Sequence, residues 1–118
     1  MHDERRRRRS EDLTTALRYQ LEASAARADL ALLVLTDDEG NVLAQAGIDG
    51  EIDVEAFGLA LPSVVGRPDD FPALPRETQL TVKAFPASGR AYVLGALGEG
   101  DVAAEVLVAM RGARRILS

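Results

Sequence analysis

The spacing of apolar side chains predicts an amphipathic helix near the start of the chain. Small and large apolar residues recur at every fourth position over residues 11–27, which places them on one face of a helix. Ser10 is a suitable N-cap, and acidic residues follow it in the first turn, where negative charge suits the helix dipole. The residues of this stripe are Leu13, Leu17, Leu21 and Ala25.

Two short apolar segments follow, and they predict an antiparallel hairpin. Residues 30–35 form an uninterrupted apolar run, which is typical of a buried strand. Residues 42–46 resume the apolar pattern after Gly40 and Asn41. Glycine supplies the positive φ that a tight reversal of the chain requires.

A second helix is expected to begin after Asp53, which is a good N-cap residue. Pro62 lies inside its apolar pattern, and a proline ring clashes with the carbonyl four residues back. We therefore expect this helix to end near Leu61 or to kink there. Residues 66–76 contain three prolines and are predicted to form a surface loop.

The last third of the chain predicts a second hairpin and a final helix. Residues 78–85 alternate between apolar and polar, and residues 91–97 are apolar on both faces, as in a central strand. Asp101 is expected to cap the helix that follows. Its inward residues are predicted to be Val102, Val106, Met110 and Ala113, with Leu107 and Leu117 near the same face.

The resulting order is helix, strand, strand, helix, strand, strand, helix. This order predicts an α/β protein, more narrowly an α+β sandwich, with an antiparallel sheet of four to five strands and helices on both faces. The first and last helices are expected together on one face and the middle helix on the other. We expect one domain over residues 10–118, preceded by a basic flexible arm over residues 1–9 that is disordered or extends the first helix.

The amino-acid composition excludes several classes of function. The 118 residues include no Cys and one His, so thiolate chemistry is excluded and histidine-based catalysis or metal binding is not expected. We expect no enzymatic activity, no cofactor and no metal. Residues 1–9 carry a net charge of +3 within a chain of net charge −5, so the remaining body is acidic and disfavours nucleic acid. Without a long apolar segment or secretory signal, no integral membrane segment and a cytoplasmic location are expected.

The segment from Ala31 to Gly47 resembles the first hairpin of the roadblock/dynein light chain family: an apolar run, Asp, two residues, Gly, then apolar and small residues. Ile52 to Phe57 resembles the entry to that family's second helix, and the later strands and final helix are also similar, so that the likeness covers residues 11–117. Within the family, the chain resembles the bacterial Mgl-type regulators of a Ras-like small GTPase. The resemblance implies a roadblock/profilin-like fold without catalytic residues. It also implies a dimeric platform for a small GTPase, for itself or for a second roadblock-like protein, in cell polarity and motility.

Two groups of residues are candidates for partner binding. An apolar face of the second helix is a candidate partner or dimer interface, although the same residues would also serve as core: Val54, Phe57, Leu61, Val64 and Val65. The basic run is a candidate electrostatic arm for an acidic partner, an anionic membrane surface or, least of all, nucleic acid, and it is equally compatible with a solvated tail: Arg5, Arg6, Arg7, Arg8 and Arg9. The alternative functions are a sensory module of GAF or profilin type that binds a small ligand, and a pure assembly module that tethers through the arm.

Overall fold

The computed structural model describes residues 2–47, 52–67, 78–99 and 102–118, with side chains from Glu11 onward. Along this part of the chain the elements follow the predicted order. They are α1 (His2–Ala28), β1 (Leu32–Asp37), β2 (Val42–Gly47), α2 (Val54–Ala60), the 3₁₀ helix η1 (Leu61–Val64), β3 (Gln79–Ala87), β4 (Arg90–Gly98) and α3 (Ala103–Leu117).

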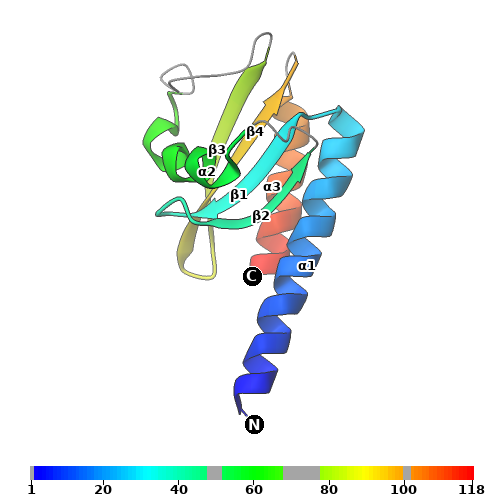
Figure 1. The fold of residues 1–118 in the computed structure, drawn as a ribbon, viewed down its shortest axis with the longest axis vertical. Helices are drawn as coiled ribbons and strands as arrows, with labels where there is room; N and C mark the ends of the chain where they lie inside the picture. Colours follow the sequence, from blue (N-terminus) through cyan, green and yellow to red (C-terminus); the bar gives the residue numbers. More distant parts are fainter. Residues whose placement is uncertain (1, 48–51, 68–77, 100–101) are drawn as a thin grey trace.

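The strands form one antiparallel sheet in the order β2-β1-β4-β3. The two hairpins therefore meet through β1 and β4, and β4 is a central strand, as its apolar sequence predicted. Helices α1 and α3 lie together on one face of the sheet, and α2 with η1 lies on the other (Figure 1). This arrangement confirms the predicted α+β fold with helices on both faces.

The larger core layer lies between the sheet and the pair α1 and α3. Leu21 from α1, Leu35 from β1 and Val106 from α3 are fully buried in it. Where α1 and α3 cross, Gly112 lies directly against the side-chain amide of Gln20. The absence of a side chain at this position lets the two helices approach closely, so that they can cover the sheet as one layer.

The smaller core layer lies between the sheet and α2 with η1. Phe57 and Leu61 pack here against Val34 and Val93 of the central strands. Leu61 lies directly over Gly95 of β4, because a Cβ atom at Gly95 would be 2.6 Å from Cδ2 of Leu61. The bare backbone of Gly95 therefore provides the space that the leucine fills.

Two predictions are wrong at the helices. Helix α1 begins at His2, so Ser10 is inside the helix and does not cap it. Arginine and glutamate favour helix and no Gly or Pro precedes Ser10, so the arm extends the helix, one of the two forms expected. In α3, Leu107 is 39% exposed and is not part of the core. Asp101 and most of the loop predicted at 66–76 lie outside the described residues.

Candidate interaction surface

The turn between β1 and β2 is organised by Asp37. Its Oδ1 atom accepts hydrogen bonds from the backbone N–H groups of Glu39 and Asn41 at 3.0 and 2.9 Å, and its Oδ2 accepts from Nδ2 of Asn41 at 3.0 Å. Desolvation alone would raise the pKa of Asp37, but the hydrogen bonds from Asn41, Glu39 and Gly40 outweigh it and hold the pKa below its usual value. The carboxylate therefore stabilises the turn in its charged form.

Gly40 at this turn contacts the backbone of α2. It has a φ of +92°, and a Cβ atom there would lie 2.7 Å from both the carbonyl oxygen of Gly58 and Cα of Leu59. On the other side of the contact, a Cβ at Gly58 would lie 2.6 Å from Cγ2 of Val42. The turn and the helix thus meet backbone to backbone, which fixes α2 on the sheet.

The two ends of α2 follow the sequence closely. Asp53 is the N-cap, and its side chain accepts a hydrogen bond from the backbone N–H of Ala56 at 3.3 Å. The α-helix ends at Ala60, and the chain continues as a 3₁₀ helix in which Pro62 occupies an early position. A proline is tolerated in the first turn of a helix, so the predicted break before Pro62 is confirmed as a change of helix type.

The structure separates the five apolar residues singled out on this helix. Phe57, Leu61 and Val64 are only 3%, 0% and 5% exposed and belong to the core of the single chain, the alternative left open for them. Val54 is half-buried, and Val65 is 37% exposed. The sequence reasoning missed Leu59, which is 59% exposed.

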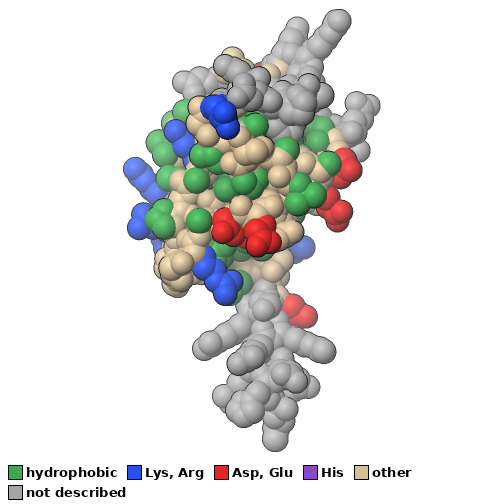
Figure 2. Space-filling model, turned by 90° about the vertical axis from the view of Figure 1, so that its left-hand side faces the viewer, with side chains coloured by type: hydrophobic (Ala, Val, Ile, Leu, Met, Phe, Trp, Pro, Cys, Tyr) green, Lys and Arg blue, Asp and Glu red, His purple; other side chains and the backbone are tan. Residues whose placement is uncertain are grey.

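The exposed apolar residues on this side define the α2 surface. Leu59 and Val65 project from α2 and the end of η1. Side chains of a strand point alternately to the two faces of the sheet, so every second residue of β3 and β4 shares the face of Val82 and Val93. Toward the turn that joins β3 to β4, the residues on this face are small and exposed. Figure 2 shows this side of the molecule, on which hydrophobic side chains are spread between acidic side chains near the centre and basic side chains toward the edges. The α2 surface consists of Leu59, Val65, Ala84, Pro86 and Ala91.

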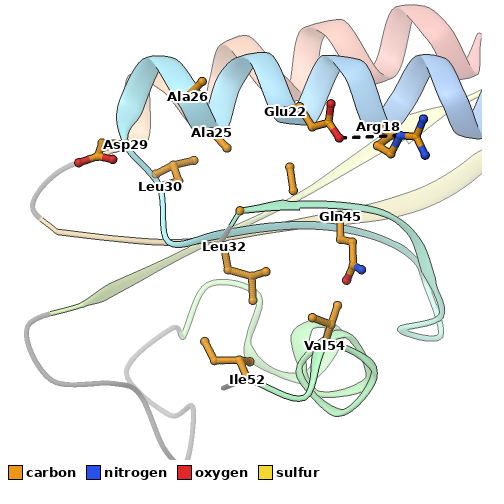
Figure 3. Close-up of a pocket in the computed structure, with 12 residues that line it drawn as sticks. Arg18, Glu22, Ala25, Ala26, Asp29, Leu30, Leu32, Gln45, Ile52 and Val54 are labelled. Atoms are coloured by element: carbon orange, nitrogen blue, oxygen red, sulfur yellow. Dashed lines mark ion pairs between the residues drawn. The ribbon is translucent and has the colours of Figure 1, made fainter. Parts of the chain in front are cut away.

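One groove away from the α2 surface is lined mainly by apolar side chains. This groove of about 710 Å³ runs between α1 and α2 beside β2, and apolar residues such as Leu32 and Ile52 line it (Figure 3). At its rim Arg18 and Glu22 form an ion pair of 3.8 Å with each other. Among the residues the structure describes, no group of His, Cys, Asp and Glu could hold a metal ion. In the same part of the chain, no helix is both long and apolar enough to span a membrane.

The five arginines of the predicted arm belong to the first turns of α1. Their side chains lie outside the described residues, so the structure places their backbone alone. Figure 1 shows that this part of α1 extends past the C-terminal end of α3. The basic run therefore extends away from the sheet and from the α2 surface.

Comparison with known proteins identifies the fold. No family model and no curated protein matches the sequence. Solved structures do match it, and they show that the chain has the roadblock-type fold of MglB.

Three MglB structures illustrate the likeness. Myxococcus xanthus MglB is 15% identical with a TM-score of 0.57, and the match covers 88% of this chain and 86% of that one. A structure described as MglB with tetrameric arrangement is 15% identical with a TM-score of 0.61, and the gliding protein MglB of Thermus thermophilus is 12% identical with the same TM-score. Both of these matches cover 89% of this chain and 90% of the other.

Proposed function

We propose that this chain is a non-enzymatic, cytoplasmic regulator or adaptor that binds a Ras-like bacterial small GTPase through its α2 surface. The observation that carries this proposal is the likeness to MglB structures over 88% to 89% of the chain. Because one fold can host many functions, the α2 surface supplies the second argument. It offers exposed apolar side chains on a helix that the sheet holds in place, as a docking platform requires.

The proposed activity needs surface and no chemistry. The chain contains no cysteine, and its one histidine lies next to Met1, so no serine has a histidine base within the folded body. The protein would act by holding the switch regions of the GTPase in one of their arrangements. We also propose that pairing with itself or with a second roadblock-like protein uses this side of the sheet, and that the complex serves polarity or motility.

The proposal is tested with the Ras-like small GTPase of the same organism, purified and loaded with GDP or with a non-hydrolysable GTP analogue. Binding to the wild-type chain is measured by calorimetry and compared with Leu59→Asp. The matched control is Leu107→Asp, which places the same charge at an exposed leucine on the opposite face. We expect Leu59→Asp to abolish binding and Leu107→Asp to preserve it, with both variants melting like the wild type.

Two outcomes would remove the proposal. One is no binding of the GTPase in either nucleotide state. The other is GTP hydrolysis by the purified chain alone that a single substitution abolishes, because this would make the protein an enzyme.

The contribution of the basic run is tested separately, by replacing Arg5–Arg9 with glutamine. We expect this variant to retain the GTPase with a modest change in affinity that fades as salt rises, since surface charges are screened beyond about 10 Å at 0.1 M salt. If the variant loses the GTPase completely while the wild type binds it, the tethering function replaces the platform function.

A further inference from the structure

Charge is distributed unequally between the two sides of the sheet. Helices α1 and α3 together carry ten of the 14 Lys and Arg side chains and six of the 19 Asp and Glu side chains, a net charge of +4. Since the whole chain has a net charge of −5, the remaining residues carry −9. Residues 2–10 contribute +3 of this charge, residues 11–28 contribute −1, and α3 contributes +2. The layer formed by α1 and α3, which we call the helical layer, is therefore basic at α3 and in the first turns of α1.

The outward side of α3 combines cations with aliphatic side chains. Arg111, Arg114 and Arg115 are exposed, and none of them forms an ion pair within the described part of the chain. Leu107 and Val108 are exposed beside them, at 39% and 42%. The one carboxylate of α3, Glu105, is bound to Arg27 of α1 at 3.0 Å. No free acid on α3 therefore opposes the three arginines.

Helix α1 also combines arginines with exposed apolar side chains. Tyr19 is 60% exposed on this helix, whereas Leu13, 41% exposed, belongs to the inward stripe and lines a groove beside Leu43 of β2 and Tyr92 of β4. The run Arg5–Arg9 lies on the turns of α1 that continue beyond the C-terminal end of α3 (Figure 1). Cations and apolar groups thus share one side of the molecule, and the α2 surface lies on the other.

We propose that the helical layer docks on an anionic lipid surface. Arginines bind headgroup phosphates, and exposed aliphatic side chains among them enter the boundary between headgroups and acyl chains, as in interfacial helices. What favours a lipid surface over an acidic protein is the cluster of five arginines, Arg5–Arg9, on one helix of the same layer, a pattern typical of segments that bind anionic headgroups. Among the described residues outside α1 and α3, seven carboxylates face three Lys and Arg side chains, and several of these carboxylates lie at the turn after β1 and at the start of α2. The same lipid surface repels them, so the molecule is oriented with its α2 surface away from the membrane and accessible to a partner.

The test is sedimentation of the full chain with vesicles of phosphatidylcholine alone or with phosphatidylglycerol added. We expect binding to the anionic vesicles only, and weaker binding as salt rises. Replacing Arg111, Arg114 and Arg115 together with glutamine is expected to weaken binding at least about tenfold, because each arginine near an anionic surface contributes to the attraction. No binding of the wild type to anionic vesicles overturns the proposal and leaves an acidic protein as the partner of the helical layer.

Two matched pairs of variants locate the docking face. Arg115→Glu is compared with Arg67→Glu, which makes the same charge change at the end of η1 on the opposite side. Leu107→Ser is compared with Leu59→Ser. We expect Leu107→Ser to lower the affinity for anionic vesicles about fivefold, because less apolar surface then leaves water on binding. In each pair the first variant should bind anionic vesicles more weakly than the wild type, and the second should bind them like the wild type. Equal losses within either pair overturn the proposal, and thermal melts of all four variants confirm that each is folded.

Discussion

The contact between Leu61 and Gly95 can be tested by a double-mutant cycle. Leu61 is fully buried, so Leu61→Ala removes its packing and leaves a cavity, which lowers the free energy of unfolding by about 2–5 kcal/mol. Gly95→Ala places a methyl group 2.6 Å from Cδ2 of Leu61, and overpacking of this kind costs about 1–3 kcal/mol. In the double variant the new methyl group occupies space that the leucine has vacated. The combined loss should therefore be smaller than the sum by about 1–2 kcal/mol.

The assay is urea unfolding of the four proteins, supported by thermal melts. For 118 residues the entropy of unfolding is about 250 cal/mol/K, so a loss of 3 kcal/mol lowers Tm by about 12 °C. Leu59→Ala is the control, because this neighbouring leucine is 59% exposed and should change Tm little. Additivity of the two single substitutions within about 0.5 kcal/mol would refute the packing described for Leu61.

Three further predictions concern other contacts. Gly40→Ala should lower the free energy of unfolding by more than about 1 kcal/mol in a urea melt, because alanine is strained at a φ of +92° and its Cβ meets the carbonyl oxygen of Gly58; a wild-type melt would contradict this. Asp37→Asn should destabilise at neutral pH, and the deficit should shrink in acid, because a carboxylate with a lowered pKa stabilises above its unfolded-state pKa and loses this effect as pH falls through its folded-state pKa. A deficit independent of pH in urea titrations would be the opposite result. Gly112→Val should displace the Gln20 side chain, separate α1 from α3 and lower Tm by several degrees in a calorimetric scan, whereas an unchanged Tm would mean that the end of Gln20 moves aside and the helices keep their spacing.

Most of the fold could be predicted because local pattern and tertiary packing agree. Central strands β1 and β4 are apolar on both faces because both faces are buried. Asp53 and Pro62 mark the two ends of α2 through capping and through the missing proline N–H. The start of α1 could not be found in this way. Ser10 has the chemistry of a cap, but the residues before it favour helix equally, so the helix runs through it.

The candidate interaction surface was harder to predict than the fold. Phe57 and Leu61 share a helical stripe, and in a helix of seven residues that stripe is needed to bury the helix on the sheet. The informative residue was the leucine off the stripe, Leu59, because an apolar side chain there has no core to enter. Helix α3 has a similar ambiguity, since Leu107 lies close enough to the inward stripe that spacing alone does not exclude it from the core.

The backbone contact between Gly40 and Gly58 has a consequence for the energetics of binding. At Gly40 the backbone of the turn touches the backbone of α2 directly, and the side chain of Val42 packs against Gly58, so the position of α2 has little freedom before a partner arrives. Binding usually loses free energy because mobile segments become ordered in the complex. Helix α2 is already ordered by folding, so this loss is small here. Affinity at Leu59 should accordingly depend on preorganisation as well as on contact area, and loosening the turn should weaken binding without altering any residue that the partner touches.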